Sequence, residues 1–270
     1  MALLSMNEVT TFRWSFEEDV AQYARAGIQA IGVWRQKLSD FGEEKGIELL
    51  AESGLKVSHL FWAGGFTGSD GRSFRSSFDD AAEALRTAAG LGAQSLIVYS
   101  GSRAGHTHNH ARRLFRDALL ELAPLAAELQ VLLAVEPMHP GCCGDFTFLT
   151  SIDDVLALLD SVASPQVRMV LDCYHLGFDA ALVRRIAELV ERIAIVQLGD
   201  GRHAPTGDQD RCLLGEGIIP VKPIVEALTA AGYDGYYDVE LLGEEFEAVD
   251  YHGLLDHAKR AFSELVGPSR

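Results

Sequence analysis

The sequence has no run of 18 uncharged apolar residues, and its first residues, MALLSMNE, include no basic region and no long apolar stretch. We therefore expect neither membrane insertion nor export. Only four of the 270 residues are cysteine, and two of them, Cys142 and Cys143, are adjacent and poorly placed to bridge to each other. In a chain without an export signal, this cysteine content is typical of a reducing compartment, so we expect a cytoplasmic protein.

Positive charge is also scarce. The 23 Lys and Arg residues against 39 Asp and Glu residues give a formal net charge of −16. This charge repels a phosphate backbone, so nucleic acid is not an expected partner. No glycine-rich phosphate loop of the G-x-G-x-x-G or Walker type follows the first predicted strand, which disfavours an open doubly wound sheet.

What the chain does have is a regular alternation of apolar runs and helical segments. Hydrophobic residues make up 48% of the chain and the mean hydropathy is +0.07, enough for a large core. Strands are predicted at residues 2–5, 28–34, 55–62, 95–99, 131–135, 167–171, 193–196 and 236–241. Helices are predicted at residues 78–91, 111–129, 152–162, 180–192 and 221–231. This alternation predicts an α/β fold, a single (β/α)8 TIM barrel over residues 1–270.

Four consecutive predicted strands in the second half of the chain each end in an oxygen-bearing side chain. These side chains are Glu136, Asp172, Gln197 and Glu240. Any one of them alone can cap a helix or bond a loop, but in a parallel barrel all four emerge at one rim. Three carboxylates that converge without a cation repel one another, so a divalent ion is the simplest relief. The all-oxygen set favours Mn2+, with Mg2+ or Co2+ as alternatives.

Three segments of the second half carry a resemblance to a known family. Residues 134–138 (AVEPM), 170–177 (VLDCYHLG) and 238–241 (DVEL) resemble the xylose isomerase-like TIM-barrel superfamily of sugar and sugar phosphate isomerases and epimerases. Residues 14–18 and 26–32 are similar to it in style. The resemblance extends over essentially the whole chain, but its specific motifs lie in the second half.

The resemblance implies roles for individual residues. Glu136, Asp172 and Glu240 would be metal ligands, the two glutamates would also move protons, and His175 would contact the substrate. Gln197 stands where ketose epimerases of the family usually have a histidine. A glutamine at this position resembles the hydroxypyruvate isomerase branch and some keto-cyclitol dehydratases.

Other side chains are candidates for contact with a small sugar-like substrate. Arg211 lies in a loop rich in small residues, where it can bind a substrate oxygen or carboxylate, or form a surface salt bridge instead. His59 and Trp62 end a predicted strand and are expected to line the mouth of the barrel, although packing explains the tryptophan equally well. Cys142 and Cys143 have no histidine base at a recognisable spacing and are expected to pack.

Together these residues predict a metal-dependent isomerase or epimerase. Chelation of a carbonyl and its neighbouring hydroxyl makes the intervening C–H acidic, and Glu136 and Glu240 are the candidates that remove and return the proton. A dehydratase acting on a keto-cyclitol or keto-acid uses the same proton abstraction and stays open. An abasic-site endonuclease of the same barrel type is disfavoured. It would need a histidine where this chain has Gln197 and an Asp-x-His sequence where it has Asp210-Arg211-Cys212. The resemblance also suggests a homodimer or homotetramer.

Overall fold

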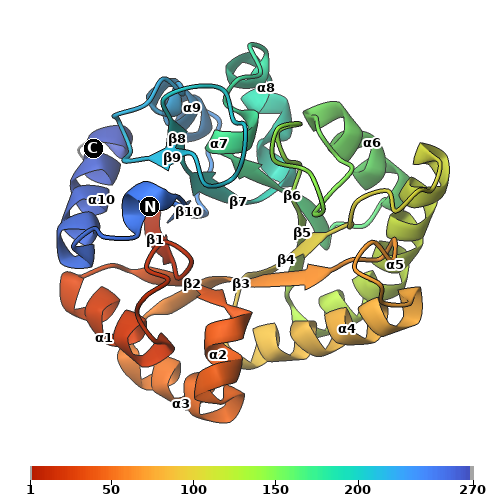
Figure 1. The fold of residues 1–270 in the computed structure, drawn as a ribbon, viewed down its shortest axis with the longest axis horizontal. Helices are drawn as coiled ribbons and strands as arrows, with labels where there is room; N and C mark the ends of the chain where they lie inside the picture. The colour runs from red at the N-terminus through yellow and green to blue at the C-terminus, as the bar shows by residue number, and fades with distance from the viewer. Residues whose placement is uncertain (1, 268–270) are drawn as a thin grey trace.

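The computed structural model describes residues 2–267, so the outer limits of the domain predicted over residues 1–270 lie outside the described residues. Eight parallel strands form a closed barrel in the order β1-β10-β7-β6-β5-β4-β3-β2 (Figure 1). The strands are β1 (Leu3–Asn7), β2 (Ala30–Trp34), β3 (Lys56–Gly64), β4 (Ser95–Tyr99), β5 (Leu132–Val135), β6 (Val167–Asp172), β7 (Ile193–Leu198) and β10 (Tyr236–Val239). The predicted TIM barrel is confirmed.

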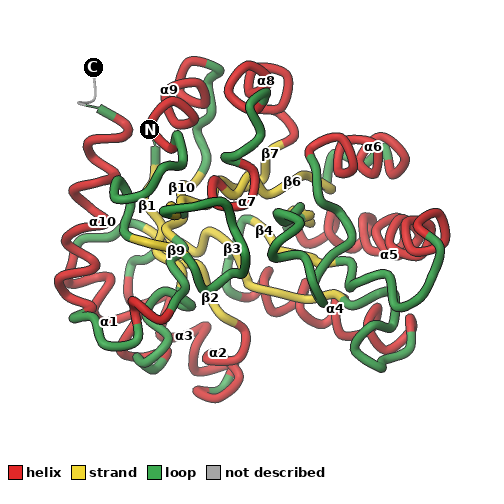
Figure 2. Tube along the Cα trace, turned by 45° about the horizontal axis from the view of Figure 1, so that its top comes forward, coloured by secondary structure: helices red, strands yellow, loops and turns green. Residues whose placement is uncertain are grey.

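Helices surround the strands, as the red ring around the yellow barrel in Figure 2 shows. They are α1 (Phe16–Ala26), α2 (Arg35–Phe41), α3 (Glu43–Ser53), α4 (Phe74–Gly90), α5 (His108–Leu129), α6 (Ile152–Val162), α7 (Cys173–Leu176), α8 (Leu182–Leu189), α9 (Val221–Ala230) and α10 (Tyr251–Val266), with 3-10 turns η1 (Val190–Arg192) and η2 (Glu244–Phe246). A two-stranded ribbon, β8 (Asp200–Gly201) and β9 (Arg211–Cys212), lies in the segment after β7. No helix among residues 2–267 is long and apolar enough to cross a membrane.

The helices and strands have the local signals that their sequences predict. Ser15 begins α1 with a capping box, in which its hydroxyl accepts from the Glu18 backbone N–H and the Glu18 carboxylate accepts from the Ser15 N–H. At the other end Gly27 takes a left-handed conformation (φ +73°) that closes the helix. Helix α6 is capped by Ser151, whose hydroxyl accepts from the Asp154 N–H.

The structure adds elements that the sequence interpretation left out. Helices α1, α2, α3 and α10 were not among the predicted helices, and the helix predicted at residues 180–192 is shorter, because α8 gives way to the 3-10 turn η1. Helix α5 begins at His108 rather than at residue 111, since Thr107 caps it through a bond from the His110 N–H. These differences lie on the outside of the barrel and leave the strand ends, where the candidate residues stand, essentially as predicted. One more helix was not predicted: the four-residue α7, which follows β6 at the rim and carries His175.

The interior of the barrel has an apolar layer and a polar layer. The apolar layer consists of Ile97, Ala134, Val170, Ala194 and Ile195, all buried. The polar layer is linked by hydrogen bonds between Ser5, Ser58, His59, Asn7 and Asp238. Because buried polar groups are costly unless they are hydrogen-bonded, this network indicates a floor with a fixed arrangement.

Candidate active site

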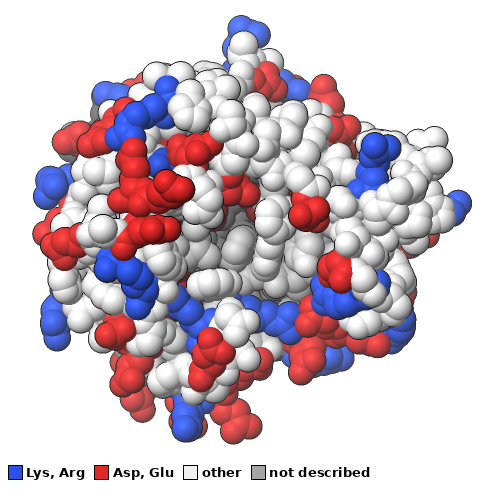
Figure 3. All heavy atoms as spheres, viewed as in Figure 1, with Lys and Arg blue, Asp and Glu red and all other residues white. Residues whose placement is uncertain are grey.

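A cavity of about 690 Å³ opens at the C-terminal ends of the barrel strands. Figure 3 shows a hollow at the centre of this face, with Asp and Glu side chains gathered on one side of it. The cavity wall combines aromatic and aliphatic side chains, such as Trp34, Phe61 and Trp62, with an equal number of polar ones. The polar residues of the wall include Glu136, Cys142, His175, Asp208, Arg211 and Glu240. The C-terminal end is where TIM-barrel enzymes place their chemistry.

The four predicted metal ligands lie next to one another at this end. Glu136 follows β5, Asp172 ends β6, Gln197 is the penultimate residue of β7, and Glu240 follows β10. These four strands are neighbours in the barrel, and all four side chains are buried. Residues two apart on a strand share a face, so each of the four stands one layer above an inward-facing side chain.

Arg211 is buried, only 2% exposed, and is not the surface residue that one interpretation of the sequence allowed. Its Nη1 donates to Asp172 Oδ2 at 3.0 Å, and its Nη2 lies 3.1 Å from Glu240 Oε1. The guanidinium also lies over the ring of Tyr174, 4.5 Å from its centroid. Gly199 makes room for it, since a Cβ there would lie 2.7 Å from Arg211 Nη1. Part of the repulsion between the carboxylates is therefore relieved by the protein itself.

Glu240 is held by three side chains. Its Oε2 accepts from Asn7 Nδ2 at 3.0 Å and from Gln197 Nε2, while Oε1 faces Arg211. Since the Gln197 amide donates through its nitrogen, its Oε1 is turned away from Glu240. That oxygen is buried and has no hydrogen-bond partner among the described residues. The orientation leaves an amide oxygen available as a ligand.

Glu136 is less constrained than Glu240. Its Oε2 is buried and has no hydrogen-bond partner within residues 2–267, and its Oε1 lies 3.8 Å from His175 Nε2. Burial, followed by the nearby charge of Glu240, raises the pKa of Glu136 well above its ordinary value. Burial also raises the pKa of Glu240 to about 8, although Arg211 opposes this shift. A further cation would favour the ionised form of both groups.

The donor set fits a divalent cation. One ligand atom each from Glu136, Asp172 and His175 lie within 4.8 Å of one another. The unpartnered oxygens of Glu136 and Gln197 are hard donors of the kind that Mn2+ and Mg2+ prefer. Such buried atoms are costly unless something satisfies them, and a bound cation would do so.

His175, in the short helix α7, faces three carboxylates. Its Nε2 lies 3.8 Å from Glu136 Oε1, 3.7 Å from Asp172 Oδ2 and 3.5 Å from Asp208 Oδ1. Burial lowers the pKa of His175 to about 4, so the ring is neutral at pH 7. A neutral imidazole at the cavity wall can donate one hydrogen bond and accept another.

Trp62 and His59, the two candidates from strand β3, have different positions. Trp62 lines the cavity and packs against Tyr99 and Phe146, with ring centroids 4.3 Å and 4.9 Å away. His59 does not line the cavity, which corrects the expectation that it stands at the mouth. Its ring lies fully buried in the barrel floor, where Nδ1 is 3.0 Å from Ser58 Oγ, and burial lowers its pKa to about 3. Strand alternation turns it inward one layer below the rim.

The segment that carries Arg211 is organised by Asp200, a residue that the sequence interpretation did not single out. The buried Asp200 carboxylate accepts backbone N–H bonds from Gly201, Gly215, Gly217 and Ile219, at 2.8 to 3.2 Å. One carboxylate thus ties both ends of the segment between β7 and α9 together. This contact sets the position of β9 and therefore of Arg211.

We expect Asp200→Asn to loosen this segment. The amide nitrogen would face backbone donors in place of an acceptor oxygen, so the free energy of unfolding should fall by about 1–3 kcal/mol. Hydrogen exchange should accelerate at the amides of Gly215, Gly217 and Ile219. Asp234→Asn is a suitable control, because Asp234 is an exposed acid in the turn before β10. Unchanged exchange at these three amides would show that Asp200 does not organise the segment.

Three further residues contact the site and were not assigned to it from the sequence. Asn7 bonds Glu240 from the first strand, and Asp208 and Cys142 line the cavity near His175. Cys142 packs as expected, because it is buried among the core residues, and it lines the cavity as well. Asn7 is the last residue of β1, two residues beyond the end of the predicted strand. Its place at a strand end is the one feature of the sequence that could have assigned it to the site. Asp208 and Cys142 lie in long segments whose paths no periodicity predicts.

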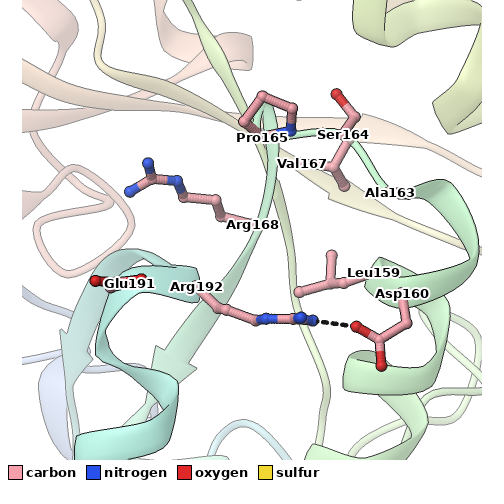
Figure 4. Close-up of a pocket in the computed structure, with 9 residues that line it drawn as sticks. All are labelled: Leu159, Asp160, Ala163, Ser164, Pro165, Val167, Arg168, Glu191 and Arg192. Carbon is pink, nitrogen blue, oxygen red and sulfur yellow. Dashed lines mark hydrogen bonds and ion pairs between the residues drawn. The ribbon is translucent and has the colours of Figure 1, made fainter.

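A second cavity, of about 600 Å³, lies at the opposite end of the barrel (Figure 4). It is formed around the end of α6 and the start of β6, and its wall includes the ion pair of Arg192 Nη1 with Asp160 Oδ1 at 2.6 Å. It is remote from the converging carboxylates. The N-terminal end of a TIM barrel contributes mainly to stability, so we assign no chemistry to this cavity.

Residues 20–262 match the family model described as Xylose isomerase-like TIM barrel. The chain is 27% identical over 158 residues to an inosose isomerase from Halalkalibacterium halodurans, a match that covers 56% of this chain and 53% of that protein. The chain thus spans about half the length of that relative. A hydroxypyruvate isomerase-like protein from Streptomyces coelicolor is 26% identical over 247 residues, covering 83% of this chain and 84% of the relative.

Solved structures with the same fold include one of the IolI protein, described as binding a zinc atom. It superposes with a TM-score of 0.85 over 98% of both chains, at 21% sequence identity. At this level of identity the likeness establishes the fold alone.

Proposed function

The chain belongs to the xylose isomerase-like TIM barrel family, and on that premise we propose that it is a divalent-metal-dependent isomerase or epimerase of a small hydroxy-carbonyl compound. Two relatives that carry isomerase names support this class. The observation that carries the proposal is the set of buried oxygen donors at one rim. Two of these atoms, Glu136 Oε2 and Gln197 Oε1, have no hydrogen-bond partner in the part of the chain that the structure describes.

The residues that would hold the ion are Glu136, Asp172, Gln197 and Glu240. Their carboxylate and amide oxygens favour Mn2+, with Mg2+ or Co2+ as alternatives. The zinc described in the IolI structure supports a divalent ion in this fold. When bound, the ion would polarise a substrate carbonyl and its neighbouring hydroxyl, which makes the C–H bond between them acidic.

The side chains at the rim would then move the proton. One of Glu136 and Glu240 removes it from carbon, and the other returns it to the adjacent carbon in an isomerisation or to the opposite face in an epimerisation. Asn7 and Arg211 hold Glu240 in one orientation, and the Arg211 charge stabilises negative charge that develops on the substrate oxygen. His175, neutral at pH 7, bonds a substrate hydroxyl.

The cavity wall favours an unphosphorylated substrate with an apolar face. Among the described residues that line it, Arg211 is the only Lys or Arg, and it already pairs with two carboxylates. Asp208 and Glu247 add negative charge, whereas Trp62 and its aromatic neighbours offer a flat surface against which a sugar or cyclitol ring can stack. No second basic side chain of the wall is placed to bind a phosphate.

We therefore expect a free ketose or inosose to react with a kcat/KM at least about tenfold above that of its phosphate ester. Two like unit charges 4 Å apart repel each other by roughly 1 kcal/mol in bulk water and by roughly 4 kcal/mol near a protein surface. Paired substrates with and without phosphate provide the measurement. Glu247→Gln, which removes one cavity-lining acid, should narrow the difference. A preference for the phosphate ester would contradict this substrate class.

The function itself is tested by proton exchange under metal control. Metal-free protein is incubated in deuterated buffer with a panel of ketoses, hydroxypyruvate and inososes, with and without added Mn2+. We expect deuterium at one carbon of a turned-over substrate, dependent on Mn2+ and lost again in excess chelator. A product that contains one water molecule less than the substrate would instead identify a dehydratase. Full turnover in excess chelator would overturn the proposed mechanism.

A further inference from the structure

A second group of potential metal ligands lies beside the oxygen-rich one. Atoms of Cys142, His175 and Asp208 that are able to bind a metal all lie within 4.8 Å of one another. Cys142 comes from the segment after β5, His175 from α7 and Asp208 from the segment between β8 and β9. All three line the cavity, so an ion there would be accessible from solvent.

These side chains have unsatisfied polar atoms. Both ring nitrogens of His175, which is 3% exposed, are without a hydrogen-bond partner among residues 2–267. The buried Asp208 Oδ1 also has none in the same range, and it lies 3.5 Å from His175 Nε2. A buried imidazole that makes no hydrogen bond is unusual in a folded protein. It indicates that something absent from the polypeptide completes this corner of the cavity.

We propose that Cys142, His175 and Asp208 form a second metal site, selective for thiophilic ions of the Zn2+ class. A thiolate, an imidazole and a carboxylate are the three ligand types of zinc sites, and the cavity leaves room for a fourth ligand from solvent or substrate. The oxygen donors of the neighbouring site instead suit harder ions such as Mn2+. Binding releases the Cys142 thiol proton to solvent, because the thiolate is the ligand.

The surrounding charge favours a cation at this position. Four acids, Glu136, Asp172, Asp208 and Glu240, stand around the single guanidinium of Arg211. The terminal nitrogens of Arg211 are engaged by Asp172 and Glu240, so Asp208 has no direct ion pair with it among those described. The Asp208 carboxylate is therefore available to a metal.

The two sites share His175, and this predicts competition. An ion bound to Cys142 and Asp208 takes the imidazole that the proposed reaction uses to bind a substrate hydroxyl. Excess Zn2+ should then inhibit the Mn2+-loaded enzyme by raising KM. This consequence rests on the proposed function, whereas the existence of the thiolate site does not.

Cobalt substitution tests the site by a spectroscopic readout that needs no turnover. Co2+ is added to metal-free protein, and the near-ultraviolet thiolate-to-cobalt charge-transfer band is recorded. We expect the band in the wild type and its absence in Cys142→Ser. The matched control is Cys143→Ser, which removes the adjacent thiol; Cys143 Sγ donates to the Pro140 carbonyl at 3.4 Å and lies outside the cluster. Zn2+ added afterwards should bleach the band.

Asp208→Asn provides a second, independent variant. It should retain the band but raise the Co2+ concentration at which the band is half-maximal by at least about tenfold, because loss of even an outer-shell partner of a metal site costs about 10- to 100-fold in affinity. A wild-type protein that binds Co2+ without the band, or a band that persists in Cys142→Ser, would overturn the second site. Either result would leave the Mn2+-dependent exchange reaction standing, so the two proposals fail separately.

Discussion

Replacing Glu136 with glutamine should lower kcat by about 100- to 10,000-fold, the usual contribution of a positioned acid or base. The substitution keeps the size of the side chain but removes the carboxylate that takes or returns the proton. It also replaces one unpartnered oxygen of the rim by an amide, so the affinity for Mn2+ should fall as well. The measurement is the rate of deuterium exchange at saturating Mn2+ and substrate, with metal binding followed separately by calorimetry.

Glu247→Gln is the matched control, because Glu247 also lines the cavity but is exposed and outside the group of converging carboxylates. Its kcat for an unphosphorylated substrate should stay within about threefold of the wild type, since a solvated acid makes a small contribution there. Comparable losses in both variants would show that overall cavity charge, and not the rim carboxylate, governs the rate. An active Glu136→Gln enzyme would remove Glu136 from the mechanism.

Replacing Arg211 with methionine should lower the free energy of unfolding of the metal-free protein by about 3–5 kcal/mol. The guanidinium is buried and paired with Asp172 and Glu240, and removal of one partner leaves uncompensated buried charge. Methionine retains most of the side-chain volume, so the loss reflects charge more than a cavity. Denaturant unfolding of metal-free protein measures the effect, and saturating Mn2+ should restore part of the lost stability.

Arg202 provides the control for this change. It lies in the same segment between β7 and α9, but its ion pairs with Glu216 and Glu245 are exposed to solvent, so Arg202→Met should leave the free energy of unfolding almost unchanged. The Arg211 charge also lowers the pKa of Glu240, which stands at about 8. In Arg211→Met this pKa should rise further, and the pH at which Mn2+ binds half-maximally should rise with it. Equal stability of the two variants would show that the Arg211 pairs contribute little.

The barrel was predictable because its strands are short, apolar and regularly spaced. All eight observed barrel strands overlap a predicted one, and their ends differ by at most two residues. The helices of the first half were harder to predict. Helix α2 follows β2 directly and is only seven residues long, so it gives little room for a helical pattern. Helix α10 closes the ring after the last strand, and the side chain of Asp250 caps its first turn.

The candidate site was predictable where it depends on strand ends. Glu136, Asp172, Gln197 and Glu240 reach one rim because parallel strands of a closed barrel end at the same face. Whether they bind a metal stays a prediction.

What the sequence could not give is the pairing among side chains from distant segments. Asn7 and Glu240 are separated by 233 positions, and Arg211 and Asp172 by 39, yet both pairs are hydrogen-bonded. The depth of a side chain inside the barrel was also not predictable, as His59 shows. It lies in the middle of β3 and not at its end, and a position on a strand does not reveal which layer a side chain occupies.

The pairing of β1 with β10 has a consequence for the nascent chain. Asn7 is synthesised 233 residues before Glu240, yet the two are hydrogen-bonded. The candidate site is therefore complete only when β10 closes the ring, and a partly synthesised polypeptide has Asn7 but not the Glu240 carboxylate that it orients. Closure of the barrel and completion of the candidate site therefore occur in the same late step of folding.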